Sequence, residues 1–200
     1  MELNRDEALA LMHEYTANEN LRRHMYAVEA AMRAYARQYG EDEELWGITG
    51  LLHDFDYERW PNDERKPDDE HPSTGVAILK EKGYPEEMRQ AIMGHADYTG
   101  VPRESRMAKT LFAVDELTGL LTACALVRPN GLADLKVKSV KKKLKDSSFA
   151  RGVNREDVKK GIEELGVDFN EHVQLVIEAM REIADELGLL GSDDSQSDSV

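Results

Sequence analysis

The sequence predicts an all-α fold. Apolar residues recur with the 3.6-residue period of a helix, residues typical of helix ends separate these segments, and no stretch alternates convincingly between apolar and polar residues. The chain has 200 residues, of which 40% are hydrophobic, and this suits one domain with a substantial core.

Helix start and stop residues divide the chain into its expected elements. Asparagine, aspartate and proline are favoured where a helix begins, and glycine is favoured just after its end. The expected helices are a short one opened by Asn4 and Glu7, then Asn18 or Asn20 to Gly40, Asp42 to Leu52, Pro72 to Lys82, Pro85 to His95, Glu104 to Leu126, Asp134 to Lys145, one capped by Asn154, and Asp168 to Gly188.

Two segments interrupt the helices. Residues 55–70 contain Pro61, Pro67 and many acidic side chains, so we expect a long polar loop, and long loops inside compact domains are often functional. Residues 97–103 contain glycine and proline and form a shorter connection.

Composition narrows the class of protein. The formal net charge of −14 at pH 7 disfavours broad binding to nucleic acid, because neutralising phosphates requires a concentrated basic face. The longest apolar run is too short for a bilayer span of about 20 residues, and the first residues are polar, so we expect a cytoplasmic protein that does not enter a membrane.

The single cysteine, Cys124, lies in an apolar run and is expected to be a buried, inert thiol. The acidic tail 191–200 is expected to be disordered.

The adjacent pair His53 and Asp54 is the strongest local chemical signal. It follows an apolar stretch and precedes the long loop. Neighbouring helical side chains point about 100° apart, but a bend at a helix end would let both reach one ion. An imidazole with a carboxylate suits divalent Zn, Fe, Mn, Co or Ni. The alternative is a histidine at a helix C-terminus beside a solvated aspartate, and the pair by itself leaves both interpretations open.

Other candidates lie on apolar faces or at helix ends, and each has an ordinary alternative. His24 lies on the apolar stripe of its helix, where a histidine is usually a packing residue. Asp115 interrupts an apolar run, so it is exposed, paired with a cation such as Lys109, or bound to metal. His71 and His95 lie at helix termini, and such positions can converge on one interior point of a helical bundle. Two histidines have polar neighbours and are expected at helix surfaces without a role: His13 and His172.

The order of these side chains resembles the HD-domain (HD/HDIG) metal-dependent phosphohydrolase superfamily. The segments that carry the resemblance are His24 to Glu29, Gly50 to Asp54, His71 to Gly75 with Ile78 and Leu79 beyond, Ala91 to His95, and Val114 to Leu117. They cover about residues 18–128, and several spaced motifs are far more specific than one dipeptide.

The resemblance implies an all-α domain with a metal site between its helices. The family's shared ligands match His24, His53, Asp54 and Asp115. The extra ligands of members that hold two metals match His71 and His95, with Asp54 bridging. We therefore expect one HD-type domain over residues 1–190, with a metal-binding core at 18–128 and a helical extension at 129–190.

One position departs from the family pattern. Many relatives continue the His-Asp motif as Ile-Gly, whereas Phe55 and Asp56 follow it here. Asp56 either orients a ligand histidine or is a solvated loop acid, and the solvated acid is the favoured interpretation.

A phosphorylated substrate would need cations besides the metals. The candidates for phosphate binding are Lys109, Arg128, Lys138 and Lys141. Lys138 and Lys141 share one helical face with Lys142 and Lys145. The simpler interpretation of this lysine face is a solvated surface; the functional one is a rim that attracts an anionic substrate.

The leading hypothesis is a phosphohydrolase that acts on a small phosphomonoester or nucleotide through metal-activated water. The resemblance implies two divalent ions (Fe, Mn, Zn, Co or Ni) with Asp54 between them. We expect Asp54 and Lys109 to be the catalytic residues and a small anionic molecule to be the partner. An HD-fold di-iron oxygenase with the same ligand set is the first alternative, and a signalling or binding module with a structural metal is the second. The substrate, the metal and the oligomeric state are left open.

Overall fold

The structure, a computed structural model, describes residues 3–191 of the chain. Within this range it consists of α-helices, one short 3-10 helix and a single β-bridge between Gly131 and Leu190. The helices are α1 (Arg5–Tyr15), α2 (Glu19–Tyr39), α3 (Glu43–Leu52), α4 (Ser73–Glu81), α5 (Glu86–Gly94), η1 (Asp97–Thr99), α6 (Arg106–Leu126), α7 (Val137–Leu144), α8 (Arg155–Leu165) and α9 (Phe169–Glu182). The predicted all-α class is confirmed.

Side-chain caps start the helices where the sequence predicts them. Each capping side chain accepts hydrogen bonds from two backbone N–H groups of the first turn, which otherwise have no partner in the helix. These capping residues are Asn4, Asn18, Asp42, Asn154 and Asp168. Gly40 follows α2 in the left-handed conformation, as predicted for a glycine after a helix.

Two helix boundaries differ from the prediction, and both lie next to segments that form long-range hydrogen bonds. The last helix ends at Glu182 rather than Gly188: the chain continues in turns through residues 183–188, and beyond them Leu189 accepts a hydrogen bond from the Leu132 amide at 3.1 Å. The lysine-rich helix begins at Val137 rather than Asp134. Just before it, the Leu135 amide donates to the Leu132 carbonyl oxygen in a turn, and the carbonyl oxygens of Leu132 and Leu135 accept hydrogen bonds from the Arg181 guanidinium.

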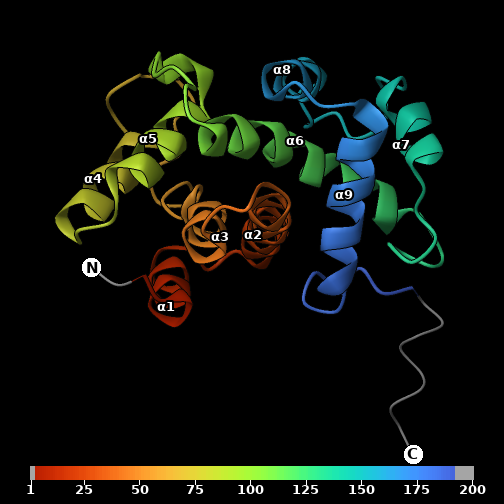
Figure 1. Cartoon of the computed structure of the whole chain (residues 1–200), viewed down its shortest axis with the longest axis horizontal. Coiled ribbons are helices and arrows are strands. Elements are labelled where there is room, and N and C mark those ends of the chain that lie inside the picture. Colours follow the sequence, from red (N-terminus) through yellow and green to blue (C-terminus); the bar gives the residue numbers. More distant parts are fainter. Residues whose placement is uncertain (1–2, 192–200) are drawn as a thin grey trace, which may run out of the picture.

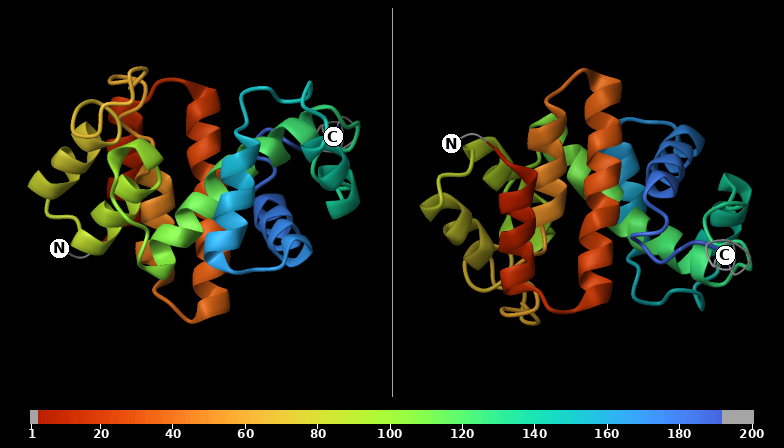
Figure 2. Two further views of the ribbon diagram at one scale, coloured as in Figure 1. Left: turned by 90° about the horizontal axis from the view of Figure 1, so that it is seen from above. Right: turned by 90° about the horizontal axis from the view of Figure 1, so that it is seen from below.

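Helix α6 crosses α2 and α3, and this crossing forms the centre of the molecule. In Figure 1, α2 and α3 are seen end-on below α6; Figure 2 shows α6 passing diagonally across the upright α2. Helices α4 and α5 lie toward one end of α6 and α7 toward the other, while α8 packs on α6 and α9 on α2. None of the described helices has both the length and the apolar character to span a membrane.

Glycine at position 50 lets α3 pack closely on α2. A Cβ atom there would lie 2.9 Å from the Val28 carbonyl oxygen of α2, closer than such atoms approach one another. Gly50 is three residues before His53, so this contact holds the end of α3 beside the first half of α2, where His24 lies.

The segment 55–70 forms the predicted long loop, but it is not purely polar. Phe55 is buried in the core, and its carbonyl oxygen accepts a hydrogen bond from the Thr16 hydroxyl at 2.9 Å. Asn62 is also buried, and its amide nitrogen donates to three backbone carbonyl oxygens of the segment 66–71. The loop is therefore held by its own polar interior.

Two predictions about single side chains have different outcomes. Cys124 is buried as predicted, and burial raises the pKa of its thiol to about 11. The surface position predicted for His172 is wrong: the residue is 1% exposed and packs between α2 and α6. Its polar sequence neighbours lie on the outer face of α9, whereas His172 lies on the inner face. Of the tail 191–200, residues 192–200 lie outside the described residues, so its predicted disorder stays a prediction.

Candidate metal centre

Six side chains from five separate segments converge in one cleft. His24 comes from α2, His53 and Asp54 from the end of α3, His71 from the residue before Pro72 and α4, His95 from the end of α5, and Asp115 from the middle of α6. They fall into two groups of three, and within each group the potential ligand atoms lie within 4.8 Å of one another. Five of the six line a cavity of about 540 Å³, and His53 lies buried beneath it.

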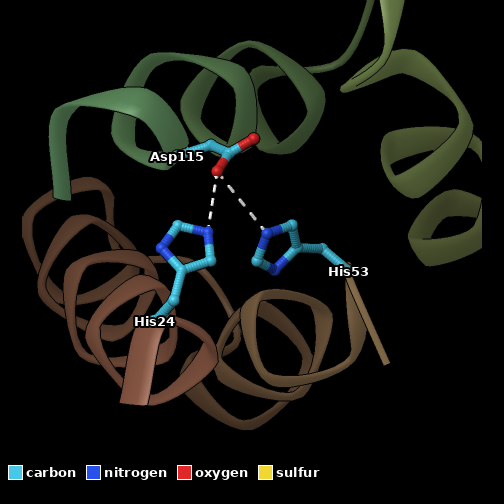
Figure 3. A group of neighbouring side chains, drawn as sticks. All are labelled: His24, His53 and Asp115. Atoms are coloured by element: carbon cyan, nitrogen blue, oxygen red, sulfur yellow. Dashed lines mark hydrogen bonds and ion pairs between the residues drawn. The ribbon is translucent and has the colours of Figure 1, made fainter. Parts of the chain in front are cut away.

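The first group consists of His24, His53 and Asp115. Figure 3 shows the two imidazoles reaching from α2 and α3 toward the same oxygen of Asp115 on α6. The Oδ1 atom of Asp115 lies 3.0 Å from Nε2 of His24 and 3.6 Å from Nε2 of His53. The sequence leaves open whether Asp115 is exposed, pairs with Lys109 or binds metal. In the structure its carboxylate faces the two histidines and does not pair with Lys109.

The second group consists of Asp54, His71 and His95. The Nε2 atoms of the two histidines lie 3.3 Å apart, and each is 3.4 Å from Oδ1 of Asp54. Both rings are nearly buried, with their exposed edges toward the cleft.

Asp54 connects the two groups because its carboxylate oxygens face different sides. Oδ1 faces His71 and His95, whereas Oδ2 lies 3.5 Å from Nε2 of His53 and 3.8 Å from Nε2 of His24. This is the arrangement expected of a carboxylate that bridges two ions.

Hydrogen bonds behind the histidines set which ring nitrogen faces the cleft. Nδ1 of His53 lies 2.8 Å from the Gly50 carbonyl oxygen, and Nδ1 of His95 lies 2.5 Å from the Ile92 carbonyl oxygen. A carbonyl oxygen only accepts, so both Nδ1 atoms carry the proton. In the neutral imidazole, Nε2 then presents its lone pair to the cleft, as a metal ligand must.

The donor atoms fit divalent metal ions. Ligands that each lie about 2.0–2.1 Å from one ion are themselves about 3–3.5 Å apart, close to most of the separations found in both groups. Nε2 of His53 is fully buried and has no hydrogen-bond partner among the described residues. A buried polar atom without a partner is costly, and a cation between Asp54 and Asp115 would satisfy it.

The two carboxylates make the cleft strongly attractive to positive charge. Burial by itself would lower the pKa of the His53 imidazole, but Asp54 and Asp115 outweigh burial and raise the pKa to about 9. Burial would raise the pKa of Asp54, yet the facing histidines hold it well below the usual range. Protons bound in this cluster would be displaced when a divalent ion binds.

Asp56 is not the solvated loop acid that the sequence interpretation favoured. It is 1% exposed, its Oδ1 accepts a hydrogen bond from Nδ1 of His71 at 2.7 Å, and its Oδ2 accepts one from the Gly75 amide at 2.7 Å. The loop turns inward at Phe55 and carries Asp56 with it, so the alternative, a carboxylate that orients a candidate ligand histidine, describes the structure.

The structure does not bring the predicted phosphate-binding cations to the cleft. Lys109, also expected to be catalytic, does not line the cleft: it lies with Arg103 and Glu164 in a neighbouring cavity that shares Asp97 with the cleft. Arg128 pairs with Asp134 at 2.7 Å. Lys138 and Lys141 are exposed on α7 at the other end of α6, together with Lys142 and Lys145. The solvated-surface interpretation of this lysine face therefore agrees with the structure.

Sequence reasoning missed the cation that does line the cleft, Arg65. It is the one basic side chain, besides histidine, among the described residues that form the cleft wall. It lies in the loop 55–70, and only the expectation that long loops are functional pointed to it. Acidic side chains also missed by sequence reasoning line the same wall: Asp97, Glu116 and Asp157. Burial and the neighbouring Asp115 raise the pKa of Glu116 to about 7.

Comparison with known proteins agrees with this geometry. The family model for the HD domain matches residues 21–120, which is half of the chain and includes all six side chains. No curated protein and no solved structure matched the chain. HD domains bind divalent metals, and the family generally includes metal-dependent phosphohydrolases. The chain belongs to the HD domain family.

Proposed function

We propose that this protein is a metal-dependent phosphohydrolase that hydrolyses a small phosphomonoester. The observation that carries the proposal is the orientation of Asp54, whose two oxygens face two groups of donors, each with two histidine Nε2 atoms. His24, His53 and Asp115 would hold one divalent ion, His71 and His95 the other, and Asp54 would bridge them. When bound, such ions acidify water and stabilise charge on a phosphoryl group.

Hydrogen bonds within the protein hold the candidate ligands in position. Backbone carbonyl oxygens and Asp56 fix the ring orientation of His53, His95 and His71. These partners bind Nδ1, on the side of each ring away from the cleft. The Nε2 atoms therefore already point into the cleft before a substrate binds.

Arg65 is the side chain proposed to bind the substrate's phosphate. Its backbone φ of 54° is unusual for a residue other than glycine, so the loop must hold it there. The buried Asn62 does so: its side chain accepts from the Lys66 amide at 2.8 Å and donates to the carbonyl oxygens of Lys66, Asp69 and His71. Among the described residues of the cleft wall, its guanidinium is the group, apart from the histidines, that can donate hydrogen bonds and positive charge to a phosphate.

The test combines elemental analysis with a phosphatase screen. Purified protein is loaded with Mn, Fe, Zn, Co or Ni, its metal content is measured, and phosphate release from metabolite phosphomonoesters and nucleotides is followed. We expect close to two ions per chain and phosphate release. Folded protein that takes up none of these metals would contradict the proposal.

Two variants separate the proposal from its alternatives. His53→Ala should stay folded but lose metal and activity, with His13→Ala, an exposed histidine, as the matched control. Unfolding of His53→Ala with no phosphate release from the parent protein would favour a structural metal instead. Oxygen consumption by iron-loaded protein without phosphate release would favour an oxygenase.

A further inference from the structure

A second cavity adjoins the metal cleft. Its volume is about 280 Å³, and His24 and Gly119 line both spaces. Its remaining lining residues come from α2, α6 and the segment after α9: Asn20, Arg23, Thr122, Leu126, Leu187 and Leu189.

One face of α6 runs from the metal centre into this cavity. Asp115, Gly119, Thr122 and Leu126 are spaced by four, three and four residues, so they lie on the same side of the helix. Gly119 lies about 6 Å along the axis from Asp115, and Thr122 about 10 Å. A molecule held at the metal centre would therefore extend past Gly119 to reach the leucines.

Packing does not explain the glycine at position 119. Glycine inside a helix is unfavourable relative to alanine, and elsewhere in this protein close contact accounts for it. A Cβ atom at Gly161 of α8 would lie 2.6 Å from Ala113 of α6, so the two helices require that glycine. A Cβ atom at Gly119 would meet only a Val153 methyl group, at an ordinary 3.9 Å. Gly119 lines both cavities, so the missing side chain leaves space at the place where they adjoin.

The far wall of the second cavity is apolar and partly preformed. Leu187 and Leu189 are each 3% exposed, whereas Leu126 is 68% exposed, which is unusual for so large an apolar side chain. Asn20, Arg23 and Thr122 make the rim polar. Apolar walls with a few polar groups are typical of sites for small organic molecules.

We propose that this second cavity binds the organic group of the substrate, and that the substrate is a phosphomonoester of an elongated, apolar alcohol. The phosphate lies at the metal centre, the chain passes over Gly119, and the apolar end packs against Leu126, Leu187 and Leu189. This inference rests on the proposed phosphohydrolase function for the placement of the phosphate.

The test measures binding of two non-hydrolysable probes to the metal-loaded full chain. Isothermal titration calorimetry compares methylphosphonate, which occupies the cleft only, with octylphosphonate, whose chain is long enough to pass Gly119. Burial of the octyl chain should make octylphosphonate bind at least about tenfold more tightly.

Two pairs of variants locate the octyl chain. Leu126→Asp should bring the ratio of the two affinities close to one, whereas Val127→Asp, the exposed neighbour that does not line this cavity, should keep it. Gly119→Leu should block the passage and lower the ratio, whereas Ala123→Leu adds the same side chain one turn later on α6, outside both cavities, and should keep it.

The outcomes separate this inference from the proposed function. Equal affinities of the two phosphonates for the parent protein, or a ratio that persists in Leu126→Asp, would overturn the inference. Absence of octylphosphonate binding would overturn it as well. If the phosphonates bind as expected but octyl phosphate is not hydrolysed, the phosphohydrolase function is contradicted. The second cavity would then remain a binding site.

Discussion

Three of the cleft histidines hold Nδ1 against an oxygen acceptor, and for His71 that acceptor is a side chain. Asp56 accepts from Nδ1 of His71 with one oxygen and from the Gly75 amide with the other. Both oxygens are needed, so the carboxylate cannot be replaced by a group with a single acceptor without losing one contact.

Asp56→Asn should weaken metal binding by about 10–100-fold. An asparagine that still accepts from Gly75 turns its NH₂ group toward Nδ1 of His71, which then favours the tautomer with the proton on Nε2, the nitrogen that faces the cleft. Metal titration with a competing chelator measures the change. Asp63→Asn, an exposed acid of the same loop, is the control, and equal metal affinity in both variants would refute this role for Asp56.

Arg65→Ala should raise KM for a phosphomonoester by about tenfold or more, since a hydrogen bond to a charged group contributes about 1.5–3 kcal/mol, and should leave the metal content unchanged. Inhibition by inorganic phosphate should weaken in parallel. Lys66→Ala is the control, because Lys66 pairs with Glu64 and does not line the cleft. An unchanged KM in Arg65→Ala would remove this residue from the substrate site.

At the scale of the helices, a buried polar group joins α2, α6 and α9. Nε2 of His172 donates to the Ala113 carbonyl oxygen at 3.1 Å, and Nδ1 accepts from the Tyr35 hydroxyl at 2.5 Å. One neutral imidazole satisfies both partners, and burial lowers the pKa of His172 from 6.5 to about 4. Its partner Ala113 is two residues before Asp115, so this hydrogen bond also holds the part of α6 that carries the candidate metal ligand.

The low pKa of His172 predicts acid sensitivity. Because the unfolded chain takes up the proton near pH 6.5 and the folded chain near 4, the free energy of unfolding should fall as pH drops across this range. The loss approaches about 3 kcal/mol, and above pH 7 the group contributes no pH dependence. Urea unfolding at several pH values, with a chelator present, should show a shallower dependence in His172→Gln than in the parent protein or in His13→Gln. The same pH dependence in all three would show that His172 does not titrate in this way.

At the scale of the whole molecule, the predicted core and its extension share one interior. Val158 of α8 and Val173 and Val176 of α9 belong to the same hydrophobic cluster as the residues of α2, α3 and α6. The loop and first turn of α8 also supply Asn154 and Asp157 to the cleft wall. The segment 129–190 therefore contributes both to the core and to the site.

Metal binding should stabilise the whole fold. The candidate ligands come from five segments, so unfolding would disperse them, and an ion at 100 times its Kd would add about 2.7 kcal/mol to the free energy of unfolding. Thermal unfolding should give a higher Tm with Mn or Zn than with a chelator. His53→Ala should show a much smaller difference, and His13→Ala the full one. A Tm that does not respond to metal would contradict the proposed centre.

Local sequence signals predicted most of the helices because caps and apolar periodicity act within a few residues. Asn18 and Asp42 cap their helices through bonds to residues two and three positions away, and such bonds can be anticipated from the sequence. The end of α9 at Glu182 could not be anticipated from local signals, because residues 183–188 still form turns and Gly188 has the positive φ typical of a glycine after a helix. The buried position of His172 could not be anticipated either, because its neighbours in sequence are polar whereas its neighbours in space are Tyr35 and Ala113.

The sequence by itself determined the all-α class, most helix boundaries and, through the resemblance to a known family, the six candidate ligands. Only the tertiary structure decided which atoms face one another: that Asp54 turns one oxygen to each group, that Asp56 lies behind His71, and that Arg65 rather than the lysines lines the cleft. The physical reason is the separation in sequence between the residues that interact. Helix formation depends on contacts within one or two turns, whereas these side chains are brought together by the packing of α2, α3 and α6 and by a loop whose course depends on its own buried hydrogen bonds.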